Sequence, residues 1–526
     1  MNIDLSKLTL QQKIGQMFLV SFAGTELSKE TKKHFSKNCL GNYIYFAGNF
    51  ADYKSIRALS DSLQDTAKEI CSYGLGAFIS VDQEGGMVAR VRTGSTHFPS
   101  NMAVTASGVS LETVEYLGES VGTGLKNLGI NINHAPVADV NNNPLNPVIG
   151  TRSYSDDPKV VSDMAIAYIR GLQRSGVMAN VKHFPGHGDT NIDSHLALPF
   201  IGHDIARLND IELAPFKAAI AAGVDSIMSA HIVFRAIDSD YPATLSSKVM
   251  TWLLRNELGF EGLIITDCMS MDAIKDYYST PRGCVLAINA GVDMICLNAD
   301  FPTQEQCVNE VYRAVMNGEI SMDTIDTAIL RILKYKSKYV CDIAPQPVEI
   351  YSAHERRADE ISEKSITLAK NDMDVLPLRD KAVFAISAPP FRANIANDDA
   401  YAIHKPKSFA EAATESLKCG FAIVSRNPNT LEIDNVLENA KDCDIILYAV
   451  YNAAQNPGQV RLFDALKAAG KRVVLVTLGA PYDILLMETA DVHIAVYEYT
   501  TRSVRSTIKA IMGEIGFMGK MPVRIC

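Results

Sequence analysis

The sequence contains no run of 18 apolar residues, so it predicts no membrane-spanning helix. Its first residues, MNIDLSKLTLQQKIGQ, lack the basic, apolar and small-residue zones of a signal peptide, and a cytoplasmic location is therefore expected. Positive charge is not in excess either. The formal net charge is −10 and is spread along the chain, which argues against a surface for nucleic acid or for anionic membranes.

Paired cysteines and nucleotide-binding loops are also missing. The ten cysteines show no CxxC pair and no regular spacing, and several lie inside apolar runs, such as Cys296 in DMICLN. This pattern predicts reduced thiols and argues against a disulfide or zinc framework. Neither GxGxxG nor a P-loop occurs, so no nucleotide site and no cofactor are expected.

What the sequence does contain, over its first 340 residues, is an alternation of short apolar runs with helix-length amphipathic segments. The runs are bounded by Gly or polar residues and are apolar on both faces, as strands of a buried parallel sheet are. They cover residues 16–22, 42–48, 76–82, 131–137, 177–184, 225–231, 262–267 and 293–299. Eight strand–helix units of this length predict a (β/α)8 TIM-type barrel with long loops.

Polar and ionisable residues gather at the C-terminal ends of these predicted strands. They are Asp82, His134, Lys182, His183, His231, Asp267 and Asn298. In a barrel those strand ends converge on one face, where active sites are built. The pattern therefore favours an enzyme.

The remainder of the chain predicts a second domain. Residues 341–353, with two prolines and little periodicity, indicate a linker between a barrel at 1–340 and a domain at 354–526. A helix is expected at 354–371, followed by five apolar strands between 382 and 499 that alternate with helices. The pattern is typical of an open, flavodoxin-like α/β sheet, and a packing or lid role is expected for it.

The densest polar stretch is KHFPGHGDTNIDSH, residues 182–195. Within it, Asp193 and His195 share one side of an extended segment, so the carboxylate can orient the imidazole for proton transfer. The alternative is a turn-forming aspartate beside a surface histidine. Lys182 and His183 end a predicted strand and can donate to sugar hydroxyls or to an anion. A metal held by His183, His187, Asp189 and His195 is the weaker hypothesis, because no HxH motif ends a strand.

Two further segments carry candidate residues. Asp267 stands where the apolar run LIIT stops, and a nucleophilic or charge-stabilising role is favoured over that of a helix N-cap, which Asp272 would serve better. In VDQEGG, Asp82 and Glu84 precede two glycines expected to let the backbone approach a ligand. Arg152, in VIGTRSY, suits recognition of hydroxyls or a carboxylate.

Six ordered motifs together resemble glycoside hydrolase family 3, in its β-N-acetylglucosaminidase branch. They are VDQEGGMVARVR…THFPS, NINHAPVADV…VIGTRSY, KHFPGHGDTNIDSHLALP, SAHIVF…PATLS, LLRNELGFEGLIITD and, more loosely, EKSITLAKN…LPL. The resemblance covers the whole predicted barrel. One departure is visible after Asp267, where Cys-Met-Ser-Met replaces the expected acidic or small residue and Leu.

The resemblance implies a role for each matching residue. Asp267 would be the nucleophile, His195 the acid/base and Asp193 the residue that orients it. Asp82, Arg152, Lys182 and His183 would hold the N-acetylglucosamine ring. No metal is implied. The partner would be a carbohydrate with a terminal N-acetylglucosamine, with neither nucleic acid nor a membrane involved.

The implied reaction is retaining double displacement through a glycosyl-aspartate. Recycling of cell-wall muropeptides is the expected setting, with chitin oligosaccharides and glycan remnants as the alternative substrates. Because a neutral imidazole does not repel an anionic acceptor, a β-N-acetylglucosaminide phosphorylase is an alternative. A metal-dependent barrel hydrolase and a non-catalytic sugar-binding protein are the other two, and the set Asp267, Asp193 and His195 argues against the latter.

Overall fold

A computed structural model describes residues 4–70, 74, 76–92, 94–190, 198–340, 349–372, 374–391 and 406–525. Its N-terminal part is an eight-stranded parallel sheet in the order β11-β9-β7-β6-β3-β2-β1-β12. A parallel bridge between Ile265 and Met294 joins the two end strands and closes the barrel. The strands are β1 (Phe18–Val20), β2 (Asn42–Tyr45), β3 (Phe78–Val81), β6 (Ile132–Asn133), β7 (Met178–Phe184), β9 (Ser226–Ser229), β11 (Leu263–Thr266) and β12 (Ile295–Leu297).

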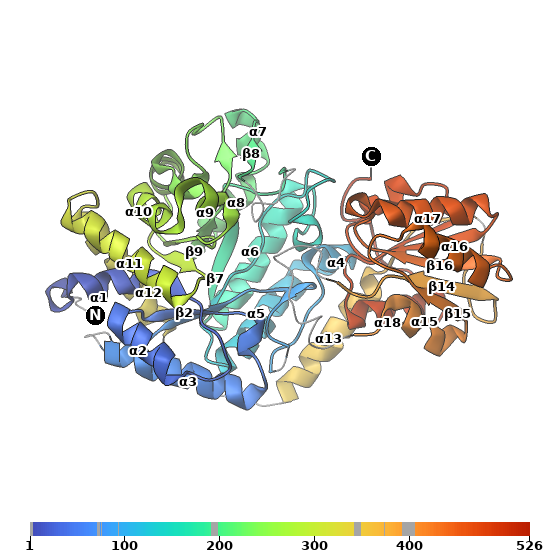
Figure 1. The fold of residues 1–526 in the computed structure, drawn as a ribbon, viewed down its shortest axis with the longest axis horizontal. Helices are drawn as coiled ribbons and strands as arrows, with labels where there is room; N and C mark the ends of the chain where they lie inside the picture. The colour runs from blue at the N-terminus through green and yellow to red at the C-terminus, as the bar shows by residue number, and fades with distance from the viewer. Residues whose placement is uncertain are drawn as a thin grey trace.

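Helices surround this barrel (Figure 1). In chain order they are α1 (Leu10–Gln16), α2 (Lys29–Asn38), α3 (Tyr53–Ile70), α4 (Asn101–Ala106), α5 (Leu111–Asn127), α6 (Pro158–Arg174), α7 (Ile205–Asp210), α8 (Ala214–Ala221), the π-helix η5 (Lys248–Glu257), α9 (Asp272–Tyr278), α10 (Thr280–Ala290), α11 (Phe301–Met316) and α12 (Met322–Tyr339). Two small sheets pair β4 (Gln83–Gly85) with β5 (Val88–Ala89) and β8 (Phe200–Ile201) with β10 (Val233–Phe234).

Local chemistry explains where these helices begin and end. Ser110 caps α5 by accepting from the Thr113 N–H, and Asp157 caps α6 just before Pro158. Helix α10 is capped at its C-terminal end by Gly291, whose φ of 107° lies in the region that favours glycine. The strands are buried on both faces, and most of their apolar side chains belong to one core shared with the helices. The predicted barrel is confirmed.

The C-terminal part holds a six-stranded sheet in the order β13-β18-β17-β16-β14-β15. Its strands are β13 (Thr367–Asn371), β14 (Val383–Ser387), β15 (Gly420–Ile423), β16 (Ile445–Val450), β17 (Arg472–Thr477) and β18 (Val492–Ala495), and its helices are α13 (Glu349–Ser365), α15 (Phe409–Leu417), α16 (Thr430–Asn439), α17 (Pro457–Ala468) and α18 (Thr501–Ile511). The last five strands are parallel, and their spatial order is that of a flavodoxin-like sheet.

The helix expected at 354–371 is wrong at both ends. Helix α13 begins at Glu349, inside the expected linker, and stops at Ser365, and strand β13 follows it, antiparallel to β18. Residues 366–367 are Ile and Thr, whose branched side chains suit an extended chain. The decisive partner, β18, lies more than a hundred residues away, so a local pattern could not reveal it.

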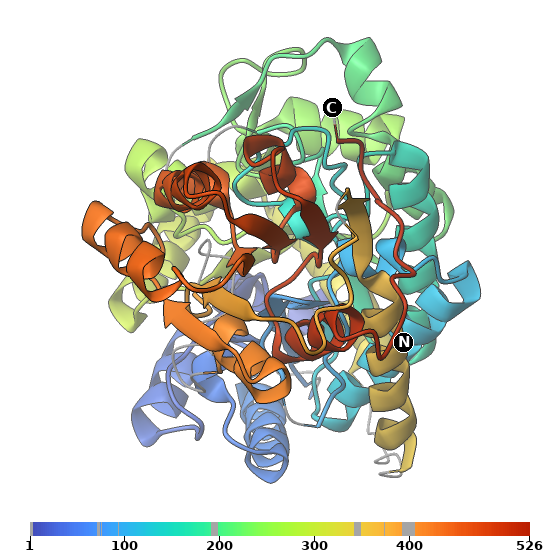
Figure 2. The ribbon, with the colours of Figure 1, turned by 90° about the vertical axis from the view of Figure 1, so that its right-hand side faces the viewer.

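The two parts lie along one long axis, with α4 and α13 between the barrel and the C-terminal sheet (Figure 1). Viewed from the side of the C-terminal part, its six-stranded sheet lies in front of the barrel (Figure 2). The C-terminal segment of the chain runs back toward the barrel. There the Ser155 hydroxyl donates to the Pro522 carbonyl at 2.6 Å. None of the described helices combines the length and apolarity that a membrane crossing requires.

Glu498 links the two parts through a buried carboxylate. It accepts from the Ser100 N–H of the barrel at 2.6 Å and from the Thr500 hydroxyl at 2.8 Å. Burial raises the pKa of Glu498 from 4.5 to about 7, because these two hydrogen bonds do not offset the lost hydration. The folded protein therefore binds this proton more tightly than the unfolded chain does.

We expect the interface to lose stability as pH rises from about 4.5 to about 7. A group whose pKa is higher in the folded protein stabilises the fold fully at pH values below its unfolded pKa. This stabilisation, on the order of 3 kcal/mol here, is lost as pH rises through the folded-state pKa. Denaturant unfolding of wild type and Glu498→Gln at pH 5 and pH 8 checks this. The wild type should lose more free energy of unfolding than the variant, and parallel losses would contradict the assignment.

Candidate active site

A cavity of about 1,100 Å³ opens at the C-terminal ends of the barrel strands. Side chains at or just beyond these ends line it, namely Ser21, Phe46, Asp82, His134, Lys182, His183, Asp267 and Asn298. Arg152, on the loop after β6, also lines it. A cavity of this size holds a sugar together with part of a leaving group. The structure thus brings Asp82, Arg152, Lys182, His183 and Asp267 to one site.

A chain of alternating charges forms one wall of the cavity. The Lys182 ammonium lies 2.7 Å from Asp82 Oδ1 and 2.6 Å from Glu84 Oε1. Arg152 donates through Nε and Nη2 to the two oxygens of Glu84, each at 2.8 Å. Glu84 therefore holds both cations, and the four charges balance. Such a two-pronged guanidinium–carboxylate contact fixes geometry as well as charge.

All four groups stay ionised at neutral pH. Burial favours the neutral carboxyls, yet Arg152 and Lys182 lower the pKa of Glu84 to about 2, and Lys182 and His134 hold the pKa of Asp82 well below its usual range. The carboxylates in turn outweigh burial and raise the pKa of Lys182 and of Arg152. The wall therefore presents fixed charges and no proton donor with a pKa near 7.

Asp139 organises the strand end that carries His183. Its Oδ2 lies 2.7 Å from His183 Nδ1, and its Oδ1 accepts from the backbone N–H of His183 and of His187. Burial would raise the pKa of this fully enclosed carboxyl, but the His183 ring and these contacts outweigh burial and lower it. An ionised Asp139 fixes His183 with Nδ1 as donor, which leaves Nε2 available to a ligand. The peptide bond between Lys182 and His183 is cis.

Asp267 follows β11 directly and is half-buried. Its backbone N–H donates to the Ser229 carbonyl at 3.2 Å, and its Oδ1 accepts from the Cys268 N–H at 2.7 Å. The N-cap alternative is wrong for Asp267, because α9 begins five residues later. Asp272 is the first residue of that helix and not its cap, since Met271 occupies the cap position.

The unusual Cys-Met-Ser-Met segment packs around the end of β12. The Asn298 N–H donates to Cys268 Sγ at 3.4 Å, and the Ser270 hydroxyl donates to the Asn298 carbonyl at 2.5 Å. Met269 is fully buried, whereas Cys268 and Met271 line the cavity. Hydrogen bonding, foremost from Cys296, lowers the pKa of the Cys268 thiol to about 7.

Packing within the protein requires the two glycines of DQEGG. A Cβ on Gly85 would lie 2.7 Å from the Pro99 carbonyl oxygen, and one on Gly86 would lie 2.6 Å from Ser100 Cβ. Both have positive φ values, of 108° and 54°. They therefore let β4 pack against residues 98–100 and so hold Glu84 in place.

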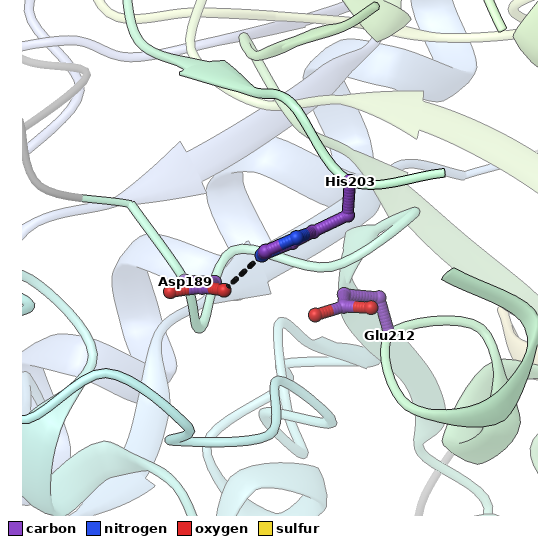
Figure 3. A group of neighbouring side chains, drawn as sticks. All are labelled: Asp189, His203 and Glu212. Carbon is purple, nitrogen blue, oxygen red and sulfur yellow. Dashed lines mark hydrogen bonds and ion pairs between the residues drawn. The ribbon is translucent and has the colours of Figure 1, made fainter. Parts of the chain in front are cut away.

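Asp193 and His195 lie outside the described residues, so their arrangement stays a prediction. Residues on either side of them are described (Figure 3). Asp189 Oδ2 lies 2.5 Å from His203 Nε2, and Arg207 lies 3.4 Å from both Asp189 and Glu212. Asp189, His203 and Glu212 could contribute three ligands to a metal ion. The Arg207 guanidinium already contacts both carboxylates and offsets part of their negative charge.

Three residues of the site were not predicted from the sequence or were given no role there. The sequence pattern assigns no partner to Glu84, and Asp139 and His187 lie beyond the ends of the predicted strands. His187 lines the cavity, and its ring stands edge-on to that of His183 with centroids 5.5 Å apart. The sequence could not show that Asp139 holds His183 and His187, because these contacts cross more than forty residues.

Residues 9–335 match the family described as Glycosyl hydrolase family 3 N terminal domain. The chain belongs to glycosyl hydrolase family 3. It is similar to Beta-hexosaminidase A of Pseudoalteromonas piscicida, with 31% identity over 91% of this chain and 88% of that protein. A solved glycoside hydrolase family 3 beta-N-acetylglucosaminidase from Paenibacillus sp. str. FPU-7 superposes with a TM-score of 0.91 and 34% identity, over 98% of this chain and 99% of that one.

More distant family 3 structures share the fold. A Beta-glucoside phosphorylase BglX is 23% identical, with a TM-score of 0.82 over 99% of this chain and 95% of that one. At this identity the likeness concerns the fold alone. The two-domain architecture, the cavity at the strand ends and the family membership together make the protein a glycoside hydrolase.

Proposed function

We propose that the protein is a retaining exo-β-N-acetylglucosaminidase that releases terminal β-linked N-acetylglucosamine. The observation that carries the proposal is the placement of Asp267 in one cavity with Asp82, Arg152, Lys182 and His183. The similarity to a family 3 beta-N-acetylglucosaminidase over nearly the whole chain supports this substrate class. Fixed carboxylates and cations on the wall suit a ring that carries several hydroxyls and an amide.

The proposed reaction has two displacements at the anomeric carbon. In the first, Asp267 forms a bond to that carbon while the glycosidic bond breaks, and His195 gives its proton to the leaving oxygen. In the second, His195 takes a proton from water, whose oxygen attacks the same carbon and displaces Asp267. Asp193 orients His195 throughout. The configuration of the sugar is retained because it is inverted twice.

A variant of His195 tests the acid/base assignment. We expect His195→Ala to lower kcat/KM for diacetylchitobiose by about 10²- to 10⁴-fold, because its leaving group needs a proton. The loss should be far smaller with a 2,4-dinitrophenyl N-acetyl-β-D-glucosaminide, whose leaving group does not. His354→Ala removes a buried histidine of α13 and serves as control. Equal losses on both substrates would refute the role of His195.

Hydrolysis is proposed over phosphorolysis, and product analysis in phosphate buffer separates the two. N-acetylglucosamine should predominate at all phosphate concentrations. Formation of N-acetylglucosamine 1-phosphate as the main product would instead make the enzyme a phosphorylase.

We further propose that the enzyme acts in the cytoplasm on muropeptide fragments of the cell wall. The described cysteines, among them Cys268, Cys284 and Cys296, are free thiols, which suits a reducing compartment. Muropeptide fragments and chitin oligosaccharides both end in β-linked N-acetylglucosamine, so the aglycone distinguishes them. Values of kcat/KM for a muropeptide disaccharide and for diacetylchitobiose, measured side by side, should favour the former. A preference for diacetylchitobiose would overturn this assignment.

A further inference from the structure

Two cysteines lie in contact in the active-site cavity, beside the residue assigned as nucleophile. Cys268 follows Asp267 directly, and Cys296 belongs to β12, the strand that adjoins β11 where the barrel closes. Of the cysteines that the structure describes, these two alone line the cavity. Both are free thiols, and they are hydrogen-bonded to each other through their side chains. The site therefore contains a pair of thiols that no step of the proposed reaction uses.

An extra residue in the chain after β11 explains why the two side chains meet. The Thr266 N–H donates to the Met294 carbonyl at 2.9 Å. The next backbone bond to the same strand joins the Met269 N–H to the Cys296 carbonyl, also at 2.9 Å. Between these two bonds one segment advances by three residues, from 266 to 269, and the other by two, from 294 to 296. Such a bulge re-aims a side chain of the longer segment, which accounts for the contact of Cys268 with Cys296.

Cys268 is the more reactive thiol of the pair. Hydrogen bonds from the Cys296 thiol and from the Asn298 N–H, the latter at 3.4 Å, favour its charged form and lower its pKa to about 7. About half of the Cys268 side chains are then thiolate at neutral pH, and the thiolate is the nucleophilic form. Cys268 is partly exposed, whereas Cys296 is 3% exposed and has a pKa raised by its bond to Cys268 and by burial. An accessible thiol of low pKa beside a second thiol is typical of cysteines that react with peroxides.

We propose that Cys268 is a modification site for hydroperoxides, and that Cys296 resolves the product into a disulfide within the cavity. The Cys268 thiolate sulfur attacks one oxygen of hydrogen peroxide, and the O–O bond breaks. The sulfur gives up two electrons and becomes a sulfenic acid, while the hydroxide that leaves takes up a proton to form water. The Cys296 sulfur then attacks Cys268 Sγ, so that the S–S bond forms and the S–O bond breaks. The Cys296 thiol proton leaves with the departing oxygen as a second water.

The disulfide is expected to stop turnover because Cys268 helps to hold Asp267. The Cys268 N–H donates to Asp267 Oδ1 at 2.7 Å, and Cys268 Sγ accepts from the Asn298 N–H. A covalent bond to Cys296 pulls Cys268 closer to β12 and disturbs both contacts, so the carboxylate no longer keeps its position. Formation of the disulfide itself does not depend on which sugar the enzyme cleaves. Only the loss of activity rests on the proposed function.

Treatment with excess hydrogen peroxide tests the pair in three proteins, each compared with its own untreated sample. Wild type should lose at least tenfold in kcat/KM for an aryl N-acetyl-β-D-glucosaminide and should recover with dithiothreitol. Cys268→Ser should keep most of its rate. Cys296→Ala should lose its rate without recovery, because a sulfenic acid that is not resolved is oxidised further to the irreversible sulfinic acid.

Mass spectrometry of the digested proteins identifies the bond independently of activity. Treated wild type should yield a disulfide-linked peptide that contains Cys268 and Cys296. Cys284 and Cys307 are also in contact but are fully buried, and they should stay reduced. Cys443→Ser, which removes a partly exposed thiol of the C-terminal part, should respond as wild type does. If the N-acetylglucosaminide is not cleaved, the proposed function fails and the linked peptide still tests the site. A Cys268 that stays reduced, or equal losses of activity in wild type and Cys268→Ser, would overturn the proposal.

Discussion

Replacing Asp267 with alanine is expected to lower kcat/KM for an aryl N-acetyl-β-D-glucosaminide by about 10⁴-fold or more. Without the carboxylate no glycosyl-enzyme can form, and water would have to attack an unactivated anomeric carbon. The loss should appear in kcat, because the residues assigned to sugar binding remain in place. Fluorescence of the released aryl alcohol measures the rate, and the affinity for N-acetylglucosamine, measured by calorimetry, should change little.

Azide provides the stricter test of this role. In the Asp267→Ala protein, azide can occupy the vacated space, and we expect it to restore turnover and to yield the α-glycosyl azide by a single inversion. Asp276→Ala removes an exposed carboxylate of the nearby helix α9 and should keep wild-type rates. Near wild-type activity of Asp267→Ala, or a β-configured azide product, would contradict nucleophilic attack by Asp267.

The barrel could be predicted because its information is local. Each strand is a short apolar run that is buried on both faces, and several helices begin at a residue, such as Ser110 or Asp157, whose side chain caps them. Strand β13 could not be predicted in this way. Its five residues, TLAKN, show no apolar alternation, its sequence continues that of a helix, and only the pairing with β18 makes it extended.

The candidate site divides along the same line. Asp82, Lys182 and Asp267 were found because a polar residue at the end of a buried strand is costly and stands out. The residues that hold these three side chains in place could not be found from the sequence, because their contacts join segments that are far apart in the chain. Glu84 binds Arg152 across 68 residues, and Asp139 binds His183 across 44. Side-chain networks of this kind are set by the closed barrel, and no spacing in the sequence encodes them.

Glu84 is the residue whose loss should most disturb the fold and the site together. Its side chain is 2% exposed and is bonded to both Lys182 and Arg152. In Glu84→Ala, Lys182 keeps its ion pair with Asp82, whereas the buried Arg152 loses the carboxylate that it contacts. Removing one member of a buried ion-pair network typically costs about 3–5 kcal/mol. We expect the free energy of unfolding of the barrel to fall by this amount, and a denaturant titration measures it.

Activity separates the two contributions of Glu84. In Glu84→Gln the amide oxygen can still accept one hydrogen bond, so the protein should remain folded while Lys182 and Arg152 lose their common anchor. We expect KM for the aryl N-acetylglucosaminide to rise at least tenfold, because the proposed sugar-binding residues are no longer fixed. Glu305→Ala is the matched control, since Glu305 pairs with Lys37 at the surface and such a pair is worth about 0–1 kcal/mol. If Glu84→Ala lost no more stability than Glu305→Ala and kept its KM, the charge chain would be incidental. A large fall in stability together with a large rise in KM would instead make Glu84 the residue through which the barrel holds the substrate-facing wall.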